Sequence, residues 1–256
     1  MSRDKSSIDS LANASKSRAN FTGRKALGAA GYVSDTDDNS YNYLGTTGQV
    51  DIIQPQEGGY KEIRIGAAWQ NIHDGADKEK GFLKNLLKKT PKKPAGVDLD
   101  LGCLYELHNG ERGSIQAFGE FFGDYDEAPF MKLSHDDRTG DDDDDDDGED
   151  EIILINGKKW PEIKRLMVYL YIYDGAVNWA QIQPQIQIRV PGEKPMIVKL
   201  HTYKSELSLC AVAGLENVRG GVRMTNYTEY YPGHAEMDRA FGFGLEWADG
   251  KKSSES

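Results

Sequence analysis

The stretch QIQPQIQIRV, residues 181–190, alternates between apolar and polar side chains along its whole length. Successive side chains of a β-strand point to opposite faces, so this pattern predicts a strand with one core side and one solvent side. The predicted core side holds Ile182, Ile186, Ile188 and Val190, and the predicted solvent side holds Gln181, Gln183, Gln185, Gln187 and Arg189. We therefore begin from a half-buried strand and ask whether its neighbours resemble it.

About eleven short runs of this kind follow one another from residue 49 onward, separated by Gly, Pro, Asn and Asp. The run RLMVYLYIY, residues 165–173, is apolar on both faces, which indicates a central strand covered on both sides. INGKKW, residues 155–160, precedes it and predicts a tight turn. The sequence as a whole predicts an all-β fold, a two-sheet β-sandwich with one or two short helices.

The flanks of this strand-rich region differ from it in composition. Residues 1–46 are rich in Ser, Asn, Gly and mixed charge, and predict a disordered N-terminal tail. The sandwich domain is expected over 47–248, and 249–256 are expected to be a disordered C-terminus. Cys103 and Cys210 both fall in apolar runs without a CxxC spacing, which is typical of buried thiols.

Two segments have helical spacing instead. GHAEMDRAFG, residues 233–242, predicts a short helix near the C-terminus. DKEKGFLKNLLKK, residues 77–89, lies within a lysine-rich insertion, 76–94, and places Phe82, Leu83, Leu86 and Leu87 on one helical face. This amphipathic segment either docks on the domain or contacts a membrane surface or partner, and the sequence leaves both interpretations open.

The acidic residues are concentrated in HDDRTGDDDDDDDGEDE, residues 135–151. Residues 136–151 hold twelve Asp or Glu and one Arg, so they carry a charge equal to the formal net charge of the whole chain, −11. The neutral remainder gives no reason to expect a nucleic-acid partner. There is no run long enough for a transmembrane segment and no apolar run typical of a leader, so we expect a cytoplasmic protein.

Motifs of enzymatic catalysis are absent from the sequence: there is no Walker loop, no GxSxG and no HExxH. A metal-dependent hydrolase would use carboxylates, but it also needs a general base and a substrate pocket, for which the sequence gives no motif. Carboxylate oxygens are hard ligands that suit Ca²⁺. The acidic stretch is no EF-hand, because Leu154 occupies the position where that loop needs a bidentate Glu.

A second pair of carboxylates comes from VDLDL, residues 97–101, where Asp98 and Asp100 share one face of a predicted strand. Two neighbouring carboxylates repel each other unless they are exposed or bridged by a cation. Either an exposed strand edge or a metal site therefore explains this pair. The run from Asp141 to Asp147 has its own simpler interpretation, a solvated charge run, because seven successive acids cannot all converge on one ion.

Several of these motifs resemble the TerD/TerA family of tellurium-resistance and stress-response proteins, with the TerA-like branch closest. The resemblance is carried by GVDLDLGCLYEL (96–107), by HDDRTG (135–140) followed by GEDE (148–151), by YIYDGA (171–176) and by IRIGAAW (63–69), and it extends over residues 51–247. It implies a TerD-type β-sandwich that binds Ca²⁺ through acidic loops and has no enzymatic activity. It also implies partners among other Ter-type proteins, including a membrane Ter component.

Carried over to this sequence, the resemblance implies a set of metal ligands: Asp98, Asp100, Asp136, Asp137, Asp147, Glu149, Asp150 and Glu151. Asp174 matches a family position as a secondary candidate. The chain departs from the family pattern in its longer acidic run, its lysine-rich insertion and its N-terminal tail. The competing hypothesis is a scaffold whose acidic loop, 135–151, binds basic protein partners without an ordered metal.

Overall fold

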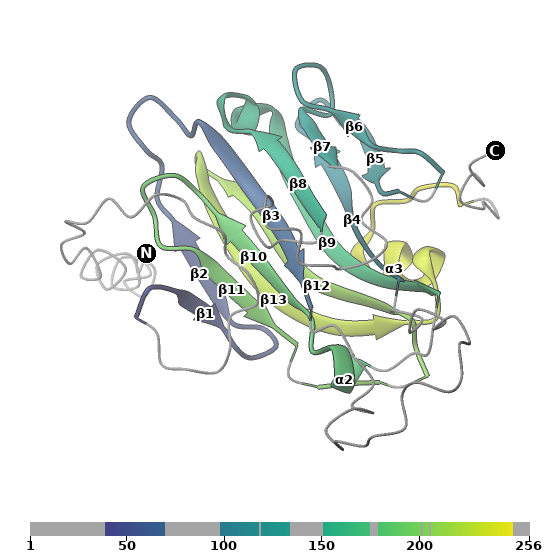
Figure 1. The fold of residues 1–256 in the computed structure, drawn as a ribbon. Helices are drawn as coiled ribbons and strands as arrows, with labels where there is room; N and C mark the ends of the chain where they lie inside the picture. The colour runs from purple at the N-terminus through teal and green to yellow at the C-terminus, as the bar shows by residue number, and fades with distance from the viewer. Residues whose placement is uncertain are drawn as a thin grey trace, which may run out of the picture.

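The structure is a computed structural model, and it describes residues 39–69, 98–117, 119–133, 151–174, 179–200, 202–204 and 206–247. Over these ranges the chain forms two β-sheets packed face to face, so the predicted all-β, two-sheet sandwich is confirmed (Figure 1). None of the helices within these ranges is long and apolar enough to cross a membrane.

The first sheet has seven strands, and all neighbouring pairs are antiparallel except the parallel pair β1 and β11. In spatial order its strands are β1 (Asn42–Leu44), β11 (Met196–Lys199), β10 (Gln185–Arg189), β3 (Glu62–Ala68), β8 (Glu151–Asn156), β7 (Met131–Leu133) and β6 (Gly123–Asp124).

The second sheet has six strands, all antiparallel to their neighbours. In spatial order these are β2 (Val50–Ile53), β13 (Gly221–Tyr231), β12 (Leu209–Val218), β9 (Ile163–Asp174), β4 (Asp98–Leu107) and β5 (Arg112–Ile115). The described helices are short: the 3₁₀-helix η2 (Gly157–Glu162), α2 (Trp179–Ile182) and α3 (His234–Phe241). The last of these confirms the helix predicted for residues 233–242.

Hydrophobic side chains fill the space between the two sheets and also cover the outer side of the six-stranded sheet. Ile186 and Ile188 of β10 belong to one inner cluster with Leu99 and Leu101 of β4, and all four are fully or almost fully buried. On the outer side, α3 and the residues after it pack on Tyr169 and its neighbours in a second cluster. Strand β9 is therefore buried on both faces, as its apolar sequence predicts.

The tight turn predicted for residues 155–160 is wrong. β8 and β9 belong to different sheets, and the 3₁₀-helix η2 carries the chain from one sheet to the other. The buried Trp160 explains this path, because its indole Nε1 donates a hydrogen bond to the carbonyl oxygen of Gly221 in the six-stranded sheet, at 3.3 Å. A local turn signal cannot distinguish a hairpin from a crossover between sheets.

The solvent side predicted for residues 181–190 is also wrong in part. Gln185 and Gln187 are 0% exposed, and Ile182 lies in α2 instead of the strand. Alternation shows which side chains share a face of the strand, but it does not show whether another layer covers that face. Gln181 and Gln183, which precede β10, are exposed as expected.

The sheet begins earlier than the predicted boundary between tail and domain at residue 46. Residues 42–44 form β1, and the amide Nδ2 of the buried Asn226 donates a hydrogen bond to the Leu44 carbonyl oxygen at 2.7 Å. The helix predicted for 77–89, the expected C-terminus at 249–256 and most of the acidic loop lie outside the described residues.

Candidate functional site

Three strand ends meet at one end of the sandwich and carry acidic residues there. Asp98, the first residue of β4, is in backbone register with Asp174, the last residue of β9. Glu151, the first residue of β8, comes from the other sheet. The acidic segment 134–150 joins β7 to β8, so both of its attachment points, Leu133 and Glu151, belong to neighbouring strands of the seven-stranded sheet.

Two of the predicted ligands are buried at this end. Asp100 is 3% exposed and Glu151 is 1% exposed, although both are carboxylic acids. The Glu151 carboxylate accepts a hydrogen bond from the backbone N–H of Leu101, which lies next to Asp100 on β4. This N–H is within reach because β5 pairs with β4 only over Cys103–Glu106, which leaves the start of the β4 edge open to a side chain.

The two carboxylates also affect the pKa values of tyrosine side chains on β9. Burial raises the pKa of Tyr169 well above its usual value, and the neighbouring Cys103, Asp100 and Glu151 raise it further. Burial, followed by Asp100, also raises the pKa of Tyr171. Asp100 and Glu151 therefore act on the same buried phenol, from two different sheets.

The chemistry of this donor set fits a hard cation. Burial of a carboxylate disfavours its charged form, and a second carboxylate nearby disfavours it further. A bound divalent cation offsets both costs, and oxygen-only ligation favours Ca²⁺ over Zn²⁺ or Cu²⁺. Within the described ranges, however, no three His, Cys, Asp or Glu side chains are grouped closely enough to hold a metal ion.

The remaining predicted ligands cannot be placed. Of Asp98 the structure describes the backbone, which lies at the correct end of β4. Five others lie outside the described residues: Asp136, Asp137, Asp147, Glu149 and Asp150. The structure thus brings Asp100 and Glu151 together, and the full ligand set stays a prediction.

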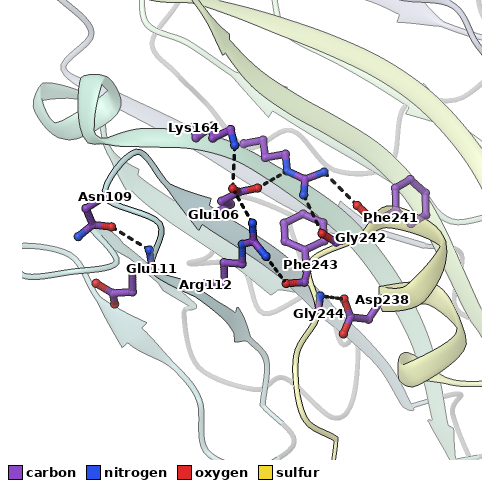
Figure 2. Close-up of polar contacts among 11 residues, drawn as sticks. Glu106, Asn109, Glu111, Arg112, Lys164, Asp238, Phe241, Gly242, Phe243 and Gly244 are labelled. Atoms are coloured by element: carbon purple, nitrogen blue, oxygen red, sulfur yellow. Dashed lines mark hydrogen bonds and ion pairs between the residues drawn. The ribbon is translucent and has the colours of Figure 1, made fainter.

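A second charged cluster, which the sequence motifs did not reveal, lies further along β4 (Figure 2). The carboxylate of Glu106 is only 3% exposed. It accepts hydrogen bonds from Lys164 Nζ at 2.7 Å, from Arg165 Nε at 2.7 Å and from Arg112 Nη2 at 3.1 Å. Burial alone would raise the pKa of Glu106, but these bonds outweigh it and lower the pKa to about 2.

The two arginines of this cluster also bind the C-terminal end of α3. Arg165 donates to the carbonyl oxygens of Phe241 and Gly242, at 3.0 and 3.2 Å, and Arg112 donates to that of Phe243 at 3.1 Å. The last carbonyls of a helix have no partner within the helix and favour cations. Glu106 therefore orients two cations that fix α3 to the outer side of the six-stranded sheet.

The residues after α3 are held by a single carboxylate. Asp238 is 2% exposed and accepts hydrogen bonds from the backbone N–H groups of Gly244 and Leu245, both at 2.7 Å. It also accepts one from the Trp247 indole at 3.0 Å. The Glu106 cluster and Asp238 are structural contacts, and neither contributes to the candidate metal site.

The alternation of β4 assigns Glu106 to a face with a buried centre, although it does not mark Glu106 as the centre of an ion-pair cluster. Asp100, Gly102, Leu104 and Glu106 share one face of the strand, and the two acids flank a buried centre. Asp238 had no comparable signal, because an acidic residue in a short helix is normally exposed.

Comparison with known proteins adds one relative. No protein-family model matches the chain. Over 193 residues the chain is 34% identical to a curated protein described as tellurium resistance protein TerA, from an Alcaligenes species. The match covers 75% of this chain and 53% of the relative, so the chain spans about half the length of the curated relative that it matches.

Proposed function

Because the chain belongs to the TerD/TerA family of tellurium-resistance and stress-response proteins, we propose that it is a non-enzymatic protein that binds Ca²⁺ at the acidic end of its β-sandwich. We further propose that it acts in the cytoplasm, in complexes with other Ter-type proteins that include a membrane component. The ligands would be drawn from Asp98, Asp100 and the two ends of the acidic loop, Asp136–Asp137 and Asp147–Glu151.

The observation that supports this proposal best is the burial of Asp100 and Glu151 at one end of the sandwich. Burial disfavours the charged form of both carboxylates, and the segment that joins β7 to β8 holds eleven further acids and one arginine. A bound cation would supply positive charge there and tie the loop to β4. Since the unfolded chain cannot present this geometry, binding would stabilise the fold by mass action.

A thermal melt distinguishes this function from a metal-free one. The full chain is melted with excess Ca²⁺, with excess Mg²⁺ and with a chelator, and the melting temperatures are compared. We expect the highest melting temperature with Ca²⁺, because Mg²⁺ demands an octahedral shell and dehydrates reluctantly. Equal melting temperatures in all three conditions would rule out a calcium site.

Substitution of the β4 pair connects the effect to the site. The double variant Asp98→Asn and Asp100→Asn should lose most of the calcium-dependent rise in melting temperature, because neutral amides are weaker ligands. The matched control is Asp126→Asn with Glu127→Gln, two exposed acids in the turn after β6, which should keep the rise.

The alternative function, a scaffold that binds basic partners through the acidic loop, rests on the concentration of charge in residues 136–151. Association through exposed charges weakens with salt, because they are screened beyond roughly 8 Å at physiological ionic strength. A scaffold would therefore show salt-sensitive partner binding, no ion-selective stabilisation and no response to the Asp98 and Asp100 substitutions.

A further inference from the structure

The outer face of the seven-stranded sheet is buried at its centre. One row of outward-facing residues crosses four neighbouring strands in register: Ile197 of β11, Gln187 of β10, Gly66 of β3 and Ile152 of β8. Ile197 and Gln187 are 0% exposed, and Ile152 is 8% exposed. A sheet face in contact with water would leave such side chains accessible.

No helix in the described ranges accounts for this burial. Trp160 of η2 and Trp179 of α2 belong to the cluster between the sheets, and Met237 of α3 belongs to the cluster on the six-stranded sheet. Three buried apolar residues belong to neither cluster, and all three lie on the outer face of the seven-stranded sheet: Ala68, Ile152 and Ile197. The two described clusters therefore do not account for the burial of this face.

Two further features indicate that the covering layer is a polypeptide segment. Gly66 lies at the centre of the buried row, and glycine in a strand interior is typical of a place where another backbone approaches closely. Gln185, in the next row, is 0% exposed, and neither its Nε2 nor its Oε1 has a hydrogen-bond partner. A buried amide without partners is costly, so the covering layer must offer it both a donor and an acceptor.

We propose that this face is an intramolecular docking surface for the lysine-rich segment, residues 76–94, which covers Ile152 and Ile197 with its apolar stripe. That stripe consists of Phe82, Leu83, Leu86 and Leu87, which share one face at helical spacing. The surrounding lysines face solvent when the stripe is docked. The segment thereby adds a third layer to the sandwich, independently of any calcium at the acidic end.

Chain connectivity and composition favour this segment over the others. β3 ends at Ala68, within the buried face, and the described chain stops one residue later at Trp69. The undescribed segment 70–97 therefore starts beside the surface that it would cover. The acidic segment 134–150 contains no apolar side chain that could bury Ile152 or Ile197. Residues 1–38 precede the edge strand β1 in the chain, and they are the occupant to exclude by experiment.

A double-mutant cycle tests the contact in the full chain. Leu86→Ala, Ile197→Ala and the double variant are unfolded with urea in the presence of chelator. When two residues are in contact, the double variant loses less free energy of unfolding than the sum of the losses in the two single variants. We expect a coupling between about twofold and about a hundredfold in the unfolding equilibrium constant. The matched control cycle pairs Leu86→Ala with Met237→Ala, on the opposite outer face, and should be additive.

Three results would overturn the proposal. One is additivity of Leu86→Ala and Ile197→Ala. Another is a Leu86→Ala variant as stable as the wild type while Ile197→Ala is destabilised, which would assign the covering layer to residues 1–38. The third is binding of the wild-type chain to phosphatidylserine vesicles that Leu86→Ala abolishes, together with additive stabilities, which would assign the stripe to a membrane surface.

Discussion

Glu151 of β8 accepts a hydrogen bond from the backbone N–H of Leu101 in β4, and this contact joins the two sheets at the end that carries the predicted metal ligands. Both partners are almost fully buried, at 1% and 0% exposure. Glu151 is thus a structural acceptor in addition to a proposed calcium ligand, and the two roles can be separated by substitution.

Glu151→Gln keeps a side-chain oxygen for the Leu101 N–H but removes the negative charge near Asp100. Without calcium, we expect its melting temperature to stay within about 4 °C of the wild type, because the hydrogen bond survives and like-charge repulsion is relieved. With calcium, the stabilisation should be much smaller than in the wild type. Thermal melts with calcium and with chelator measure both quantities.

Glu151→Ala should lose both roles and cost about 1–3 kcal/mol even without calcium, because a buried N–H loses its acceptor. The exposed Glu111 provides the control, since Glu111→Gln should leave both melting temperatures unchanged. A full calcium response in Glu151→Gln would exclude Glu151 from the ligand set and leave it with the structural role alone.

Glu106→Gln is expected to destabilise the chain at neutral pH by about 2–4 kcal/mol, since it leaves Lys164, Arg165 and Arg112 around a neutral amide. This is less than for a fully buried pair, because Lys164 and Arg112 are 51% and 43% exposed and are screened by water. Urea unfolding gives the difference in free energy directly.

The pH dependence of that difference follows from the lowered pKa of Glu106, about 2 against an ordinary value of 4.5. A carboxylate whose pKa falls on folding stabilises the fold above its unfolded pKa and loses this contribution as the pH falls through the folded value. The difference in the free energy of unfolding between wild type and Glu106→Gln should therefore be largest above pH 4.5 and decrease toward pH 2. Glu216→Gln is the control, because its pair with Arg223 is exposed and worth about 0–1 kcal/mol. A difference in the free energy of unfolding that stays constant from pH 4.5 to pH 2 would contradict the lowered pKa of Glu106.

The fold was largely predictable because its strands are short, alternate clearly and end at turn-forming residues. The pattern of 165–173 correctly predicted a strand covered on both faces. The same kind of evidence failed at Gln185 and Gln187, because burial there depends on a layer that is distant in sequence. It failed again at 155–160, because the identity of a strand's partner is a property of the whole sheet.

In the candidate site, only the residues that belong to a recognisable sequence motif were predictable. Asp98 and Asp100 stand out as a pair, and Glu151 closes an acidic run. Glu106 does not stand out in the sequence, because a single acid at the end of an apolar strand is common. Its three cationic partners come from β5 and β9, which are distant in the sequence. Long-range ion pairs have no local sequence signature, whereas clustered ligands do.

His234 should make the fold less stable in mild acid. Its ring packs between Tyr169, Tyr171 and Trp247, with ring centroids 5.0 to 5.2 Å apart. Burial lowers the pKa of His234 from 6.5 to about 4. As the pH falls from 6.5 to 4, the unfolded chain binds a proton that the folded chain does not, so the free energy of unfolding decreases.

His234→Phe keeps an aromatic ring at this position and removes the proton. Its stability relative to the wild type should improve by about 1–3 kcal/mol between pH 7 and pH 4, measured by urea unfolding in chelator. The exposed His108 is the control, and His108→Phe should show no such relative gain. Parallel pH profiles of His234→Phe and wild type would show that the His234 ring is protonated equally in both states.

Gly102→Ala should be strongly destabilising although it adds one methyl group. Gly102 lies beside Tyr169 on the neighbouring strand, and a Cβ at this position would overlap the tyrosine ring. That ring is held in place because its hydroxyl donates to Gln116 and it packs in the cluster under α3. We expect a loss of about 1–3 kcal/mol from overpacking, measured by urea unfolding.

The matched control for Gly102→Ala is Gly45→Ala, because a Cβ at Gly45 would meet nothing within 4 Å. Its free energy of unfolding should stay within about 0.5 kcal/mol of the wild type. Displacing Tyr169 should also disturb Asp100, since the two side chains interact electrostatically. Gly102→Ala should therefore reduce the calcium-dependent rise in melting temperature, and Gly45→Ala should not. An intact calcium response in a destabilised Gly102→Ala variant would show that Tyr169 supports the fold alone and does not position Asp100.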